Sequence, residues 1–142
     1  MIQEHKDLLH IHKDLLLKDL SARLPYKVKV EIKNVCKICT LEEIDCSDEE
    51  MSVAVKHENG ELAGYDFDLA KPYLFPLESM TEEQEKEFAL LQTSLGNEGF
   101  LYVWNCVNMM KWLIENNFDY NGFIPRGLAN DATSKDIYKL VK

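Results

Sequence analysis

The sequence predicts an α+β fold: an N-terminal helix, a small curled antiparallel sheet of four or five strands, two C-terminal helices and a docked C-terminal segment. Three observations predict it. Apolar residues recur at spacings of three and four over residues 5–24 and again after residue 81, whereas apolar and polar residues alternate over much of residues 27–69. The 142 residues fit a single domain, because single cores usually close within about 100 to 200 residues.

We divide the chain into an N-terminal extension (1–12), a helix (13–26), a small sheet or barrel (27–77), a helical part (78–130) and a C-terminal tail (131–142). Pro25 is expected to end the first helix, because the residue before a proline is pushed out of the helical region. The letters HKDLL recur seven residues apart, at 5–9 and 12–16. The helix is expected to pack on its own domain, with self-association through it as the alternative, since two heptads do not specify a coiled coil.

The strands follow from period-two patterning. Residues 27–33 alternate Lys or Glu with Val or Ile, which is typical of a half-buried strand. Residues 36–44 are predicted to form a less regular strand that can contain a bulge. Residues 51–57 and 62–69 flank Asn59 and Gly60, which predicts a hairpin with a type I′ turn. Residues 73–77 lie between two prolines and are expected to be an edge segment. An SH3-like barrel is one form such a sheet can take.

The helical part opens with a capping box, in which Thr81 is the N-cap and Gln84 completes the box. Gly96 is expected to end this helix, and a second helix is predicted over 102–117. Residues 118–128 are too apolar for a free tail and are expected to dock on the core. The expected core consists of inward strand positions and one face of each main helix: Val28, Val30, Ile32, Tyr65, Phe67, Leu16, Leu20, Val107 and Ile114.

The net charge of -9 is unevenly spread. Residues 41–98 carry sixteen acids and three bases, whereas residues 1–40 carry five acids and eight bases. Because duplex binding depends on cationic contact with phosphates, nucleic acid is an unlikely partner, and only the lysines at 27, 29, 33 and 37 suggest one. No apolar run reaches the roughly 18 residues of a membrane span, so no membrane partner is expected. The absence of a signal-like N-terminus favours the cytoplasm.

The motifs that carry chemistry are weak. Cys36 and Cys39 have zinc-knuckle spacing, but no second pair follows them, so we expect no metal and structural thiols. Asp66 and Asp68 share one face of a predicted strand, as paired catalytic carboxylates do, yet that face is expected to be solvated. No nucleophile elbow, phosphate-binding loop or HExxH motif is present. We therefore expect neither a catalytic residue nor a cofactor, and an enzyme is the minority interpretation.

Three blocks of the sequence carry a resemblance: LLLKDLSARLPY at 15–26, KPYLFPLESMTEE at 71–83 and FDYNGFIPRGLA at 118–129. Together they resemble the signatures of a family of short uncharacterised proteins from Bacteroides-type bacteria, their phages, prophages and mobile elements. The family has no established activity, so the resemblance implies an origin and a bacterial host cell. The sequence departs from the family pattern at Lys27, where glycine is common, and at Phe75 and Asn121, where arginine is frequent.

Three functions are left open. The favoured one is a phage or mobile-element accessory protein that acts by non-catalytic recognition of a host or phage protein. The alternative is a protein that binds a small molecule, such as a nucleotide signal of host defence, between the sheet and the C-terminal helices. Nucleic-acid association comes third. The candidate binding residues are two arginines, two aromatic residues and an amide: Arg126, Arg23, Tyr120, Trp104 and Asn121.

Overall fold

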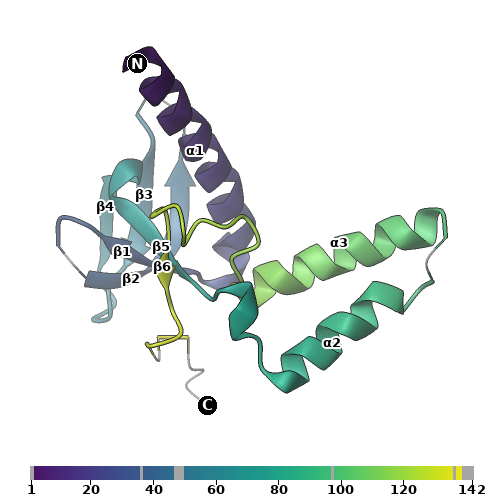
Figure 1. Cartoon of the computed structure of the whole chain (residues 1–142). Coiled ribbons are helices and arrows are strands. Elements are labelled where there is room, and N and C mark those ends of the chain that lie inside the picture. Colours follow the sequence, from purple (N-terminus) through teal and green to yellow (C-terminus); the bar gives the residue numbers. More distant parts are fainter. Residues whose placement is uncertain (1, 36, 47–49, 97, 136, 139–142) are drawn as a thin grey trace.

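The structure is a computed structural model that describes residues 2–35, 37–46, 50–96, 98–135 and 137–138, with side chains of the first helix described from Lys13 onward. The chain runs from a long helix into a sheet, then into a helical hairpin, and returns to the sheet (Figure 1). The hairpin projects away from the sheet and the first helix (Figure 1).

Helix α1 (Ile2–Arg23) is a single helix that includes most of the expected N-terminal extension. It gives way to a 3-10 turn, η1 (Leu24–Tyr26), with Pro25 near its start. Proline tolerates the first turn of a helix but removes a backbone donor, so the α-helical pattern ends where the sequence predicts. Lys27 then takes a left-handed conformation with φ of 55° and redirects the chain into the sheet.

The described strands form one six-stranded sheet in the order β4-β3-β2-β1-β5-β6. All neighbours pair antiparallel except β5 and β6, which are parallel. The α+β fold class is therefore confirmed, whereas the sheet is open and does not close into an SH3-like barrel. The strands are β1 (Lys29–Ile32), β2 (Lys37–Asp45), β3 (Ser52–Lys56), β4 (Leu62–Asp66), β5 (Ala70–Leu74) and β6 (Asn130–Asp131).

The expected irregularity of β2 and the expected hairpin are both present. The pairing of β2 with β3 shifts register between Leu41 and Glu43, which marks a bulge. Strands β3 and β4 form the hairpin around Asn59 and Gly60. Of these two residues only Gly60 has a positive φ, at 90°, so the turn is not the type I′ turn that was expected. The Asn59 carboxamide instead accepts a hydrogen bond from the backbone N–H of Glu61 at 2.9 Å.

Strand β5 lies inside the sheet, so the prediction of an edge segment at 73–77 is wrong. It pairs with β1 through the register of Val30 with Pro72 and with β6 on its other side. Pro72 is tolerated because β6 is only two residues long and begins opposite Tyr73. No residue of β6 lies opposite Pro72, so the pairing of β5 with β6 does not need the N–H that proline lacks.

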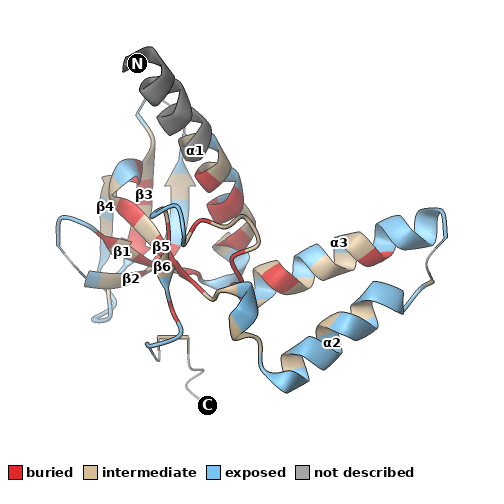
Figure 2. Cartoon of the chain, in the orientation of Figure 1, coloured by how far each residue is buried: buried red, intermediate tan, exposed pale blue. Residues whose placement is uncertain are grey.

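The core lies between the inward face of the sheet and α1 (Figure 2). Leu16 and Leu20 of the helix pack against the strands, with Phe67 from the short 3-10 turn η2 (Phe67–Leu69). Val107 is exposed and Ile114 is only half-buried, and neither belongs to this cluster. That part of the core prediction is wrong because their helix projects from the body. The strand residues of the core are Val30, Ile32, Cys39, Leu41, Val53, Val55, Ala70 and Leu74, and Val28 joins them from just before β1.

We expect Phe67→Ala to lower the free energy of unfolding by about 3–5 kcal/mol, through lost transfer energy and the cavity that remains, because its side chain is buried. Leu62→Ala, at an exposed strand position, should change it by less than about 0.5 kcal/mol. Urea titration of both variants measures the difference. Equal midpoints for the two variants would contradict this core.

Candidate functional site

The helical hairpin consists of η3 (Leu77–Ser79), α2 (Glu82–Thr93) and α3 (Phe100–Glu115). The predicted capping box is confirmed: the Gln84 N–H donates to the Thr81 hydroxyl at 3.1 Å, and the Thr81 N–H donates to the Gln84 side chain at 2.9 Å. The second helix begins two residues earlier than expected, after Gly99. The start of α2 is therefore defined by local sequence, whereas α3 begins without a side-chain cap.

Asn105 of α3 joins the two helices at their outer end. Its buried amide donates to the carbonyls of Gln92 (3.1 Å) and Gly96 (2.5 Å). Its carbonyl oxygen accepts from the Leu95 N–H at 3.2 Å. The last carbonyls of a helix lack partners within the helix, so Asn105 satisfies polar groups at the end of α2. The side chain thereby holds the turn of the hairpin.

Trp112 fixes the inner end of the hairpin. Its ring lies 5.5 Å from that of Phe88 on α2, and its indole N–H donates to Glu87 at 3.2 Å. On its other side it stacks on the buried ring of Phe118, with centroids 5.5 Å apart and planes at 13°. Offset or stacked aromatic pairs stabilise by about 0.5–1.5 kcal/mol beyond their burial. The hairpin is thus attached to the body at its base.

One face of α3 carries a continuous line of exposed apolar side chains, which we name the α3 stripe. Its members lie at positions i, i+3, i+4, i+7 and i+10, the spacing of one helix face. Figure 2 shows how little of this helix is buried compared with α1 and the sheet. The α3 stripe consists of Phe100 (80% exposed), Val103 (53%), Trp104 (55%), Val107 (44%) and Met110 (40%).

The α3 stripe is larger than scattered surface apolar residues. Aromatic side chains bury about 150–250 Å² each when covered, so the exposed fractions amount to an apolar patch on the order of 400 Å². Patches of a few hundred Å² on soluble domains mark interaction sites or binding grooves. Tyr102 and Leu90, elsewhere on the hairpin, are exposed as well.

Acidic residues are concentrated on the other helix of the hairpin, whereas Lys111 lies one turn beyond Val107 on the face of the α3 stripe. Residues 82–115 carry six acids and two lysines, and four of the acids lie on α2: Glu82, Glu83, Glu85 and Glu87. These four side chains are exposed. The hairpin therefore carries the apolar α3 stripe on one helix and most of its negative charge on the other.

Arg23, a predicted binding residue, is fully buried instead. Its guanidinium forms an ion pair with the buried Asp19 one helical turn earlier. It also donates to the Phe118 carbonyl at 2.5 Å and lies 5.1 Å from the centroid of the Tyr120 ring. Its Nη1 atom has no hydrogen-bond partner among the described residues. Arg23 therefore ties α1 to the segment that follows α3.

Tyr120 and Asn121 belong to the same cluster. Asn121 donates to the second carboxylate oxygen of Asp19 at 2.8 Å. Burial, followed by the Asp19 charge, raises the pKa of the Tyr120 hydroxyl. The neighbouring Asp119 accepts from the backbone N–H groups of Phe123 and Ile124, both at 2.9 Å. The expected docking of residues 118–128 is confirmed, since Phe118 and Phe123 are buried.

Trp104 and Arg126 lie apart from this cluster. Trp104 is at the centre of the α3 stripe. Arg126 is exposed and forms no ion pair within the described part of the chain. Because Arg23 is buried and Arg126 exposed, the two arginines do not line a common cavity among those found over the described residues.

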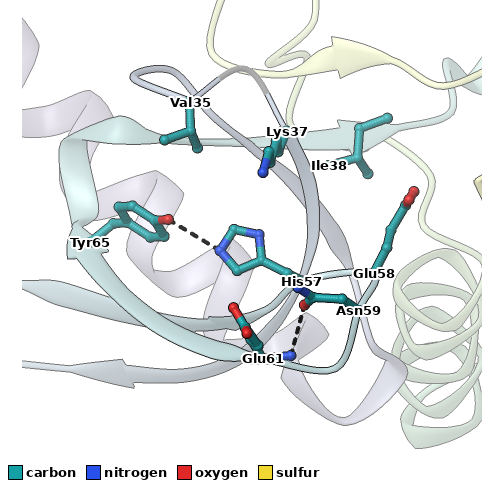
Figure 3. Close-up of a pocket in the computed structure, with 8 residues that line it drawn as sticks. All are labelled: Val35, Lys37, Ile38, His57, Glu58, Asn59, Glu61 and Tyr65. Carbon is teal, nitrogen blue, oxygen red and sulfur yellow. Dashed lines mark hydrogen bonds between the residues drawn. The ribbon is translucent and has the colours of Figure 1, made fainter.

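A cavity of about 560 Å³ lies beside the β3–β4 hairpin. His57, directly after β3, borders it, and its Nε2 lies 3.1 Å from the Tyr65 hydroxyl of β4 (Figure 3). Its Nδ1 lies 3.3 Å from the Cys39 sulfur of β2. Cysteine beside histidine is the pairing of nucleophilic catalysis. Here the thiol is 1% exposed and burial raises its pKa. Cys39 is therefore a buried thiol that no substrate reaches.

The other residues singled out for chemistry have structural contacts or lie outside the description. Asp66 accepts from the Asp68 N–H at 3.1 Å and caps η2, while Asp68 forms an ion pair with Lys13 at 3.1 Å. Cys36, the expected partner of Cys39, lies outside the described residues. The described side chains include no group of three or more His, Cys, Asp or Glu suited to a metal ion.

Comparison with protein-family models, with curated proteins and with solved structures found no match to this chain. Among the described residues no helix has the length and apolar character needed to cross a membrane. The geometry on its own singles out the α3 stripe, of which sequence reasoning assigned Val107 to the core and named Trp104 as a candidate binding residue. A signal was present in the sequence: α3 is apolar on nearly every side, more than one partner helix can cover.

We expect Asp19→Ala to lower the free energy of unfolding by about 3–5 kcal/mol, because removing one partner leaves the buried Arg23 charge uncompensated. Asp14→Ala is the matched control on an exposed turn of the same helix and should change it by less than about 0.5 kcal/mol. Chemical denaturation followed by circular dichroism compares them. If Asp19→Ala unfolds at the same midpoint as the control, the ion pair does not stabilise the fold.

Proposed function

We propose that the protein is a non-catalytic recognition protein that binds another protein through the α3 stripe. One observation carries the proposal: large apolar side chains at the spacing of a single helix face are exposed along α3. Exposing such side chains to water is unfavourable by about 25 cal/mol per Å². Covering them on association recovers that free energy.

The spacing of the α3 stripe suits one recurring mode of recognition. An amphipathic helix can lay its apolar face in a groove of the partner, with anchors at i, i+3, i+4 and i+7. Phe100, Val103, Trp104 and Val107 have that spacing. Trp104 is the expected main anchor, because tryptophan is enriched among the few residues that dominate interface energies.

The net negative charge of the hairpin indicates the chemistry of the partner. Two hairpins brought together would place six acids and two lysines of each copy side by side. Like charges across an interface oppose association and select against the wrong partner. The same acids disfavour an anionic membrane surface. We infer a different protein, with an apolar groove or face bordered by lysine and arginine.

The resemblance of the sequence to a family from phages and mobile elements supplies the setting of the proposal. The partner is then a host or phage protein, and binding takes place in the cytoplasm of a bacterial host. The absence of a described catalytic cluster leaves recognition as the function that the geometry supports best. The small-molecule alternative concerns a different part of the molecule, the cavity where the helical hairpin joins the sheet.

Site-specific photo-crosslinking in a Bacteroides-type host tests the proposal. A photoreactive residue in place of Trp104 should give one discrete heavier adduct, because this position is at the centre of the α3 stripe. Val107→Glu in the same chain should reduce the adduct at least tenfold, as a charge at an apolar anchor removes more than about 1.4 kcal/mol of binding. Mass spectrometry of the crosslinked peptide identifies the partner surface.

The control places the photoreactive residue at Glu42, an exposed position on β2, where no adduct is expected. Val107→Glu must also keep the parent melting temperature, since Val107 is outside the core. The proposal fails if Trp104 gives no adduct or if Glu42 gives the same one. An adduct of twice the chain mass would identify a second copy and contradict the inferred basic partner.

A further inference from the structure

A second cavity, of about 680 Å³, lies where the helical hairpin joins the sheet. Segments far apart in the sequence border it: η1 and the start of β1, the residue after β5, the start of α2, the end of α3 and the C-terminal segment. Its volume is within the roughly 300–1,000 Å³ of sites for small molecules. We name it the root cavity.

The root cavity carries an excess of positive charge in an acidic protein. Lys27 and Lys29 border it, opposed by Glu115. The ammonium of Lys29 donates to the Thr40 hydroxyl at 2.6 Å, which uses one of its three donors. The remaining donors, with the exposed Lys27, can bind one anionic group.

Aromatic rings form the apolar wall of the root cavity. The Phe75 ring lies 5.6 Å from that of Tyr138, with planes at 50°. The Tyr138 hydroxyl accepts from the Lys29 N–H at 2.8 Å and donates to the Tyr73 carbonyl at 2.6 Å. These bonds hold the ring in place, and burial raises the pKa of this hydroxyl so that it stays neutral. Tyr26, 40% exposed, borders the same cavity.

Backbone strain and an unsatisfied polar atom occur at the same place. Over the described residues, the non-glycine residues with positive φ are Lys27 (55°) and Asn117 (58°), and both border the root cavity. The side-chain oxygen of Asn117 is buried and has no hydrogen-bond partner within the described ranges. Strained backbone and unpaired buried groups cost stability and cluster at functional sites.

We propose that the root cavity binds a mononucleotide, with its phosphate at Lys27 and Lys29 and its base against Tyr26 and Phe75. An anion with a planar aromatic part satisfies both the lysines and the rings, and bases stack well on aromatic side chains. The charge supports a single phosphate and not a di- or triphosphate, because two lysines and Glu115 sum to +1 and one phosphomonoester already carries about −1.5 to −2. The N–H donors of a base are also groups that the unpaired oxygen of Asn117, a residue bordering the cavity, can accept from. This site is separate from the α3 stripe and does not depend on it.

Isothermal titration calorimetry with AMP, GMP, CMP and UMP tests the proposal on the purified full chain. At least one should bind saturably at one site per chain. Lys27→Gly should weaken that binding at least tenfold. Glycine accepts the positive φ of this position, so the variant removes the ammonium without straining the backbone. Tyr26→Ala should weaken binding to a similar degree.

Lys86→Ala, which removes an exposed lysine of α2 outside the cavity, is the matched control and should bind like the parent. Melting temperatures with and without nucleotide check that each variant is folded. The proposal is overturned if no mononucleotide binds at millimolar concentration or if Lys27→Gly binds like the parent. It is also overturned if inorganic phosphate binds as tightly as the nucleotide, because the aromatic wall would then contribute nothing.

Discussion

The buried ion pair between Arg23 and Asp19 is the interaction on which the arrangement of the parts depends. Burying two charges costs several kcal/mol unless further hydrogen bonds satisfy them, and here Phe118 and Asn121 supply such bonds. The pair thereby joins the end of α1, which packs on the sheet, to the segment that follows α3. That segment pairs with the chain just after β5. The Phe75 N–H donates to the Asn117 carbonyl, and the Phe75 carbonyl accepts from the Asp119 N–H. Helix, sheet and hairpin meet at this one place.

This attachment explains how the hairpin can project with so little burial of its own. Trp112 stacks on the buried Phe118 ring at its base, and Asn105 closes its outer end. The main cluster of buried apolar residues lies beneath α1, and the α3 stripe is outside it. Because the side chains of the α3 stripe contribute little to the stability of the fold, they can serve binding without a cost in stability.

Local patterns predicted much of this fold. Period-two patterning located β1, Pro25 marked the end of α1, and the pair Thr81 and Gln84 located the start of α2, because each depends on neighbours in the chain. Tertiary features could not be read in this way. The place of β5 inside the sheet depends on a β6 strand over 50 residues later, and Arg23 resembles an exposed helix residue until Phe118 and Asp19 are seen beside it. An apolar helix reads as a core helix whether or not a partner is present, so Val107 was assigned to the core, and Trp104 alone of the α3 stripe was named as a candidate binding residue. The function of the α3 stripe as a docking surface stays a prediction.

Binding through the α3 stripe requires that the stripe is exposed to water in the free protein, and the fluorescence of Trp104 reports on this exposure directly. With Trp112→Phe, Trp104 is the remaining tryptophan of the chain, and its fluorescence can be recorded on the purified protein over a dilution series. We expect emission close to that of tryptophan in water, efficient quenching by acrylamide, and no change with protein concentration. A blue-shifted emission that resists acrylamide at every concentration would contradict the account, because the α3 stripe would then be covered by the protein's own chain. A blue shift that appears only as concentration rises would show that a second copy covers it and would exclude the partner we infer.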